Sequence, residues 1–204
     1  YTYNKCTKRS QKIGGPYPVC TIYKLGRKGS KSEPICVCPK RFYEARIVED
    51  VIKYCWVGER PNNVTFAHEV KMSGFGTVDF VVADIEGDAV KEFVSVELQA
   101  IDITGSYEPA YTAVLNSQLL ERKPQYHFNY ANVRKRYVAQ LIGKGHFHHH
   151  WGTRMVAILQ DVIYNRIKKD VGFPELDIKD SNIVFMLYKF VESLEDGEKR
   201  FSLI

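Results

Sequence analysis

The stretch that decides the fold is residues 76–100, "GTVDFVVADIEGDAVKEFVSVELQA". It contains two valine-rich runs separated by the polar turn Glu86–Gly87–Asp88, and so predicts two β-strands joined as a tight hairpin. The runs are almost continuously apolar, which is typical of strands in a sheet that is covered on both faces. Polar residues nevertheless interrupt them at Asp79, Glu97 and Gln99, where burial is costly without a compensating role.

Alternation of side chains along a strand places these polar residues together. Glu97 and Gln99 share one face of the second strand, about 7 Å apart along it. The other face of that strand is apolar, with Val94, Val96, Leu98 and Ala100. On the first strand Asp79 faces away from the apolar set Val78, Phe80 and Val82. If the strands pair as a hairpin, Asp79 and Glu97 converge.

Two converging carboxylates repel each other, and burial increases that cost. A divalent cation removes the repulsion, and hard oxygen ligands are those that Mg²⁺ prefers. Such an ion polarises a phosphodiester and generates hydroxide from water near neutral pH. The alternative is that Glu97 and Gln99 face solvent on a half-exposed sheet, but the apolar flanks of the strand argue against it.

The remaining chain predicts helices on the faces of a central sheet. Helical spacing of apolar residues predicts a helix over 41–58, in which Cys55 is a core residue, and two further helices near 111–122 and 130–142. Strands are expected over 65–72, which holds His68, over 153–167 and 181–193, and over 199–204, which is expected to pair with the strand before it. A polar loop is expected over 102–108. This order predicts an α/β domain with a mixed central sheet flanked by helices.

Composition restricts the partners only mildly. The chain has 204 residues, a formal net charge of +5 and a pI near 8.8, which permits a polyanionic partner without requiring one. No apolar run approaches the roughly 18–20 residues that a membrane-spanning helix needs, so no membrane association is expected.

Four of the five cysteines, Cys6, Cys20, Cys36 and Cys38, lie in the first 40 residues among many Gly, Pro and basic residues. This segment cannot bury much apolar surface, and four thiolates match a tetrahedral structural metal site that would supply its folding energy. Zn²⁺ and iron both accept such a site, and four unrelated reduced cysteines are the alternative. The sequence thus predicts a metal-binding module over 1–40 and a core over 41–204. The odd cysteine count favours a reducing compartment.

These features together resemble the NotI-type restriction endonucleases, which belong to the PD-(D/E)XK nuclease superfamily. The resemblance rests on the four cysteines, on "GTVDF" and "VELQAID", and on "NYANVRKRYVAQLIGKGH" at 129–146, and extends from Cys6 to about Ile163. Its most specific element is Glu97-x-Gln99, because most of the superfamily has Lys at the last position.

The resemblance implies a restriction-endonuclease-like core and a type II enzyme that hydrolyses double-stranded DNA with Mg²⁺-activated water. Asp79 and Glu97 would bind Mg²⁺, Gln99 would orient the nucleophile, and the four cysteines would hold one Fe or Zn ion. A homodimer, a GC-rich palindromic site and the cytoplasm of a bacterium or archaeon are further implications. Glu69 is the candidate for an additional upstream acid, with Glu49 as the second choice.

Basic residues and histidines are open to two interpretations. Arg27, Lys28 and Lys31 lie in a basic loop, and Arg134, Lys135 and Arg136, with Arg122 and Lys123, fall around the middle helices. They either contact DNA or form a solvated surface. Residues His146 to His150 are interpreted as a polar loop, because consecutive histidines in a loop cannot all face one metal ion.

Two other functions are compatible with the same residues. The first is a non-catalytic, metal-stapled DNA-binding protein in which the carboxylates are structural. It predicts salt-dependent DNA binding without cleavage. The second is a repair or structure-specific nuclease on the same core, which would prefer branched DNA to a linear palindrome.

Overall fold

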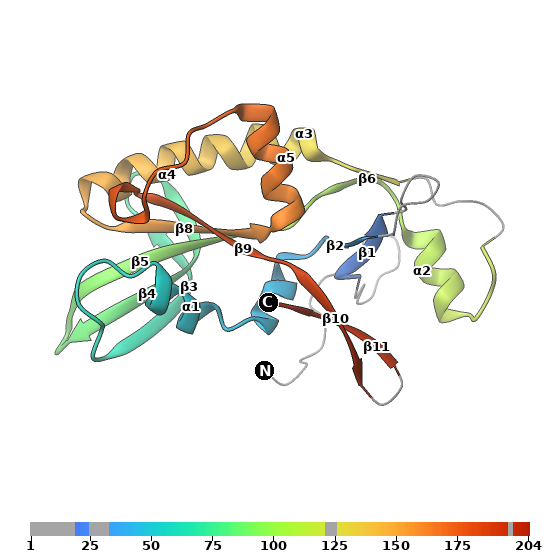
Figure 1. Ribbon diagram of the computed structural model, residues 1–204, viewed down its shortest axis with the longest axis horizontal. Coiled ribbons are helices and arrows are strands. Elements are labelled where there is room, and N and C mark those ends of the chain that lie inside the picture. The colour runs from blue at the N-terminus through green and yellow to red at the C-terminus, as the bar shows by residue number, and fades with distance from the viewer. Residues whose placement is uncertain (1–18, 25–32, 121–125, 196–197) are drawn as a thin grey trace.

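A five-stranded mixed sheet forms the centre of the computed structural model, which describes residues 19–24, 33–120, 126–195 and 198–204 (Figure 1). The strand order is β3-β4-β5-β8-β9. Their bounds are Val64–Met72, Gly76–Glu86, Ala89–Gln99, Arg154–Gln160 and Ile183–Tyr188. The strands β3, β4 and β5 pair antiparallel, whereas β5, β8 and β9 pair parallel. The predicted α/β class with a mixed central sheet is therefore confirmed.

The opening stretch forms the β4–β5 hairpin as predicted. Pairing runs from Phe80↔Val96 to Glu86↔Ala89. Gly87 occupies the turn with φ 62°, a left-handed conformation that glycine adopts without steric cost. The predicted hairpin is therefore confirmed, with one register shift between Asp84 and Ile85.

Helices cover the two faces of the sheet differently (Figure 1). The 3₁₀ helix η1 (Pro39–Glu44) and α1 (Ile47–Tyr54) pack on one face, where Phe42, Val51 and Cys55 meet the apolar side chains of β4, β5 and β8. The other face carries a continuous helical segment and α5. That segment comprises α3 (Tyr130–Asn132), the π-helix η2 (Val133–Val138) and α4 (Ala139–His150), and α5 spans Asp161–Val171. We call these the α1 face and the α4 face.

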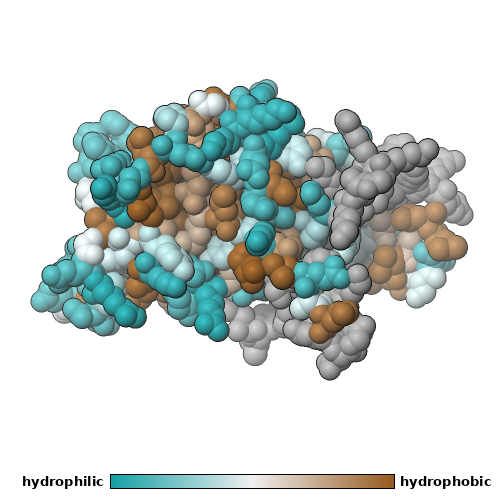
Figure 2. Space-filling model, viewed as in Figure 1, coloured by the Kyte–Doolittle hydropathy of each residue, from teal (hydrophilic) through white to brown (hydrophobic). Residues whose placement is uncertain are grey.

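Smaller elements surround the sheet. Three two-stranded sheets pair β1 (Thr21–Lys24) with β2 (Glu33–Cys36), β6 (Ile103–Gly105) with β7 (Tyr126–Phe128), and β10 (Phe190–Glu195) with β11 (Glu198–Leu203). The short helices are α2 (Glu108–Leu115) and η3 (Ile178–Asp180). Figure 2 shows apolar side chains exposed over α2, where Val114 and Leu115 are 77% and 63% accessible. No helix in these ranges is long and apolar enough to cross a membrane.

Three predicted elements differ in extent. The helix expected over 41–58 is divided into η1 and α1, and Ala45 between them is extended. The helix expected over 111–122 begins earlier and ends at Leu115. The expected loop over 102–108 contains β6. The burial of Cys55 and the pairing of the last strand with the one before it are confirmed.

The prediction of a strand through the whole of 153–167 is wrong beyond Gln160. β8 ends there and α5 begins at Asp161. Within the helix Ile163, Tyr164 and Ile167 are buried, a spacing of three to four residues that fits one helical face. The short apolar run before it hid the change of period, because strand and buried helix look alike over so few residues.

The interpretation of His146–His150 as a loop is also wrong, because these residues form the last turns of α4. His148 is fully buried, and its ring lies 5.4 Å from that of Phe75 and 5.7 Å from that of Trp151, measured between centroids. His146 and His150 are exposed, with ring centroids 4.4 Å apart. One helical face therefore packs against aromatic residues while the other faces outward.

The end of β2, in the described part of the cysteine-rich segment, is packed into the core at Ile35 and Cys36. Cys36 is fully buried, its N–H donates to Gln160 Oε1 at 2.9 Å, and its carbonyl oxygen accepts from Ile101 N–H at 3.1 Å. Gln160 Nε2 in turn donates to Pro34 O at 2.8 Å. The strand β2 is thus held against the end of β8, and the division of the chain at residue 40 stays a prediction.

Candidate functional site

The candidate site lies where β4 and β5 separate. Their pairing ends at Phe80↔Val96, and the next residue of β4 is Asp79. The Asp79 carboxylate takes over the backbone pairing, because its Oδ2 accepts from Leu98 N–H at 2.6 Å. Beyond this point Val78 packs with Val81 and Ala83, not with Phe80 and Val82 as expected from alternation. The departure of β4 from β5 leaves the Asp79 carboxylate beside the backbone of Leu98.

Glu97 lies on β5 next to Asp79, on the α4 face. It is 8% exposed, and its carboxylate forms a salt bridge with Lys144 of α4, whose ammonium also donates to Thr77 O at 2.8 Å. Lys144 is itself only 6% exposed. A buried pair of opposite charges on different elements is stable only with close geometry and additional hydrogen bonds, and this pair has both.

Glu69 lies opposite Asp79 on β3, between the pairs His68↔Phe80 and Val70↔Val78. Its φ of 52° is left-handed, which is unfavourable for a residue with a Cβ atom and costs of order 1–3 kcal/mol. Backbone strain of this kind clusters at functional sites. The structure thus brings Glu69 beside Asp79.

The electrostatics of the three acids reflect their proximity. Burial raises the pKa of Asp79 above its usual value, the Leu98 N–H and Lys144 lower it in part, and the charge of Glu69 raises it. Burial likewise raises the pKa of Glu97 to about 7, although the ion pair with Lys144 opposes that shift. Both carboxylates therefore lie where a negative charge is costly and a further cation would be stabilising.

Tyr137 lies beneath this group on η2. It is 2% exposed, and among the described residues its hydroxyl has no hydrogen-bond partner. Burial, followed by the charges of Glu97 and Asp79, raises the pKa of Tyr137 well above its usual value. An unpaired buried hydroxyl beside two carboxylates suits an additional ligand or water in the site.

Gln99 follows on β5 at the edge of a neighbouring cavity. Its amide donates to the carbonyl oxygen of Ala100, and its side chain lines a cavity of about 210 Å³ together with Arg136 and Gln140 of the helical segment. An uncharged amide cannot act as a general base, but it can orient a water or a phosphate oxygen. Gln99 therefore lies between the carboxylates and a cavity whose lining includes the cationic Arg136 and the anionic Asp102.

The donor set fits Mg²⁺. This ion binds proteins through one or two carboxylates and keeps several waters, so Asp79 and Glu97 suffice. No group of three or more His, Cys, Asp or Glu side chains suited to a metal occurs in the ranges that the structure covers. Mg²⁺ does not need three protein ligands, because waters complete its coordination.

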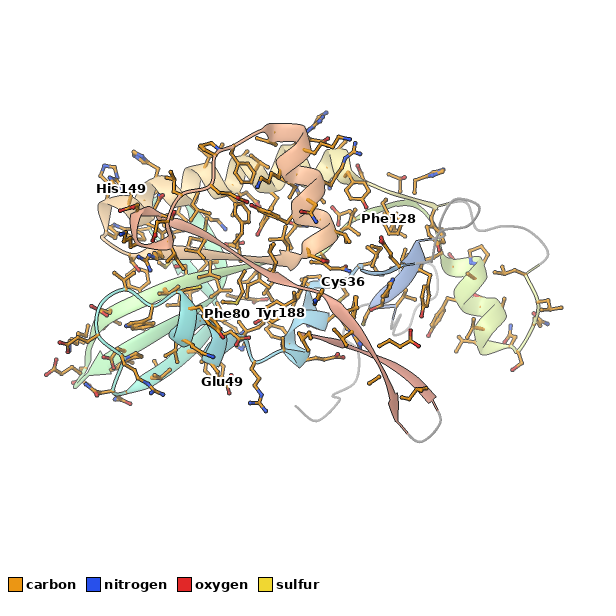
Figure 3. All side chains as sticks on the ribbon, in the orientation of Figure 1. Cys36, Glu49, Phe80, Phe128, His149 and Tyr188 are labelled. Carbon is orange, nitrogen blue, oxygen red and sulfur yellow. The ribbon has the colours of Figure 1, made fainter. Side chains whose placement is uncertain are left out.

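Other candidate residues lie elsewhere. Glu49 is on α1, across the sheet from α4 (Figure 3), so the structure does not bring it to Asp79. Arg134 lies 3.9 Å from Asp170 of α5, whereas Lys135 and Arg136 are exposed. Residues outside the described ranges are Arg27, Lys28, Lys31, Arg122 and Lys123.

Three of the four N-terminal cysteines are described. Val37 N–H donates to Cys20 O at 2.9 Å, which places the backbone of Cys20 across from the Cys36–Cys38 segment. The Cys36 thiol donates to Cys38 O at 3.2 Å, and burial raises the pKa of Cys36 to about 12. These three thiols do not form a metal-ready group with one another, and Cys6 lies outside the described residues.

Sequence reasoning missed Lys144 and Tyr137. Both lie on one face of the helical segment with Leu141 and His148, at spacings of three and four residues. The available signal was a lysine on an otherwise buried helical face, since lysine is almost never fully buried unless it is paired.

Two comparisons with known proteins complete the description. The family model for "Restriction endonuclease NotI" matches residues 2–203. No individually curated relative matches the chain.

Proposed function

The chain belongs to the NotI restriction endonuclease family, and we propose that it cuts a GC-rich palindromic site with Mg²⁺ held by Asp79 and Glu97. As a member of that family it is a type II restriction endonuclease, a hydrolase that acts on double-stranded DNA. The observation that carries the proposal is the meeting of Asp79 and Glu97 at the point where β4 leaves β5. The family match covers residues 2–203 and by itself names no site residue.

In this proposal the three acids have separate roles. Asp79 and Glu97 supply the oxygen ligands, and Asp79 is oriented by the Leu98 N–H. Glu69 is the additional acid, positioned by its strained backbone to bind a water in the site. Bound Mg²⁺ supplies a Lewis acid at the phosphate and a nucleophile at neutral pH. Gln99 orients the reacting groups through its amide.

The cavity beside Gln99 suggests how DNA approaches. Arg136 lines it and is exposed, so its guanidinium can pair with a phosphate oxygen near the site of cleavage. Lys135 is its exposed neighbour, and Arg134 is partly occupied by Asp170. The basic residues Arg27, Lys28 and Lys31 are proposed as further backbone contacts. Phosphate contacts of this kind position DNA without reading its sequence.

Two structural features belong to the same proposal. A palindromic site matches a two-fold symmetric homodimer, in which each copy cuts one strand. Cys6, Cys20, Cys36 and Cys38 are proposed to hold one Fe or Zn ion, and binding would have to bring the thiols closer together. Metal analysis of the purified protein should give about one ion per chain, and Cys38→Ser should remove it. An odd number of cysteines, with four of them assigned to a metal, agrees with a reducing cytoplasm.

Digestion of a long DNA of known sequence, followed by mapping of the ends, tests the proposal. We expect discrete fragments in Mg²⁺, none in EDTA and none with Asp79→Ala. End mapping gives the site and its symmetry directly. A smear without defined ends, preference for branched DNA, or full activity of Asp79→Ala would overturn it.

A further inference from the structure

Lys144 is the least expected residue of the site. Among the described residues it is the only buried lysine or arginine, with 6% of its surface exposed. Burial of an ammonium costs free energy unless the charge is paired. Its position is built by the fold. Gly145 next to it lets α4 approach β9, because a Cβ there would lie 2.7 Å from Ile183 Cγ1. Asn182 Nδ2 donates to Gly145 O at 2.5 Å and holds that approach.

The hydrogen bonds of Lys144 leave capacity for one more partner. An ammonium has three N–H donors. One donates to Thr77 O at 2.8 Å and one to the Glu97 carboxylate. Among the described residues no partner takes the third. The backbone carbonyl of Lys144 also accepts from His148 Nδ1 at 2.7 Å, which ties this turn of the helix to a buried ring.

The surroundings of the ammonium are otherwise negative or neutral. Its charge acts on Asp79 as well as Glu97, and the β5 residue two positions on is the neutral Gln99. The Tyr137 hydroxyl, which has no partner among the described residues, is close enough for the charges of both carboxylates to raise its pKa. The positive charge that β5 lacks is therefore supplied from α4.

We propose that Lys144 is the fixed cation of the cleavage site: it neutralises Glu97 when no divalent ion is bound, and it donates to a phosphate oxygen of bound DNA. Only the contact with the DNA phosphate rests on the proposed function. A fixed positive charge beside Glu97 opposes a divalent ion electrostatically while it favours the phosphate. Removal of the charge must then move metal binding and cleavage in opposite directions.

The experiment compares Lys144→Met with Lys144→Arg and with Lys169→Met, an exposed lysine on α5. Ca²⁺ binding is measured by calorimetry and thermal shift, and cleavage in Mg²⁺ under single-turnover conditions. For Lys144→Met we expect Ca²⁺ affinity to rise by about tenfold and the cleavage rate to fall by about 100-fold. Lys144→Arg should keep the wild-type Ca²⁺ affinity and much of the cleavage, and Lys169→Met should change neither.

If Lys144→Met is unstable, Ca²⁺ should raise its melting temperature more than that of the wild type, because the ion replaces the lost counter-charge on Glu97. A Ca²⁺ affinity that falls, or an instability that Ca²⁺ does not relieve, would show a purely structural lysine. Absence of cleavage by the wild type overturns the proposed function instead. The Ca²⁺ measurements still decide whether Lys144 is the counter-ion of Glu97.

Discussion

The two faces of the central sheet are built on opposite principles. On the α1 face, Phe42, Val51, Val96 and Ile158 are fully buried in a continuous apolar cluster. On the α4 face, β5 carries the buried polar residues Ser95 and Glu97, and Lys144 of α4 forms a salt bridge with Glu97. Both faces are covered, so the charges of the α4 face lie in an interior where only paired or ligand-bound charges are tolerated.

The proposed function assigns cleavage to the α4 face and leaves the α1 face to stability. Among the described residues, the buried cluster of the α1 face consists of cysteines and apolar or aromatic side chains, and it contains no carboxylate or ammonium. The α4 face has a left-handed Glu69 at its edge, an unpaired Tyr137 hydroxyl and acids with raised pKa values. Substitutions on the two faces should therefore move stability and cleavage separately.

The largest expected effect is on cleavage, from Asp79→Asn. The amide keeps an acceptor for Leu98 N–H but loses the charge that would bind Mg²⁺. The cleavage rate should fall about 10⁴-fold, which corresponds to the several kcal/mol of transition-state stabilisation that a metal ion supplies. Because burial raises the pKa of Asp79, the charged form is disfavoured in the folded state, and stability at neutral pH should be unchanged or higher. Single-turnover cleavage and urea unfolding measure the two quantities. A large loss of stability would make Asp79 a structural residue.

Phe42→Ala should give the reverse on the α1 face. Phe42 is fully buried, and its truncation should lower the free energy of unfolding by about 3–5 kcal/mol. Cleavage by the folded protein at low temperature should stay within a few-fold of the wild type. Val114→Ala on the exposed surface of α2 is the matched control for stability. Equal loss of cleavage and stability would remove the distinction between the faces.

Glu69→Gly should separate strain from function. Glycine adopts the left-handed conformation freely, so stability should rise by about 1 kcal/mol, while loss of the acid lowers cleavage by about 100-fold. Ser117, with φ 51°, offers the control: Ser117→Gly should be stabilising with unchanged cleavage. If Glu69→Gly cleaves normally, the strain at this position serves no catalytic purpose.

The smallest effect is expected from Ser95→Ala. Ser95 is fully buried on the α4 face, and its hydroxyl has no partner among the described residues. Removal of an unpaired buried hydroxyl should raise the free energy of unfolding by up to about 1 kcal/mol. Cleavage should not change. A fall in cleavage would extend the functional part of β5 beyond Glu97 and Gln99.

Local patterns predicted the part of the site that lies on one hairpin. Asp79 and Glu97 belong to neighbouring strands joined by a short turn, so the hairpin brings them near each other, although the alternation of β4 is interrupted between Val78 and Phe80. Lys144 was not predicted because it is 47 residues from Glu97, and no local periodicity reports a contact across that separation. The error over 153–167 has another origin, since β8 ends at Gln160 and α5 begins at Asp161 with no turn or loop residue between them.

The histidines of α4 also show that a contact between distant residues can decide local structure. In isolation, "GHFHHHWG" has no apolar period strong enough to predict a helix. Burial of His148 among Phe75, Phe93 and Trp151 supplies the packing that extends α4 through them. Helices are stabilised mainly by packing of one face, so their length depends on distant partners.

The sequence by itself determined the α/β class, the β4–β5 hairpin and the pairing of acids at its open end, because alternation and turn residues are local properties of the chain. Only the tertiary structure decided that Lys144 forms a salt bridge with Glu97 and that Glu69, not Glu49, lies beside Asp79. It also places the Tyr137 hydroxyl near the acids, without a partner in the part of the chain that the structure describes. These relations join β3, β5 and the α4 segment. They arise from the burial of charge between elements far apart in the chain, which no local pattern encodes.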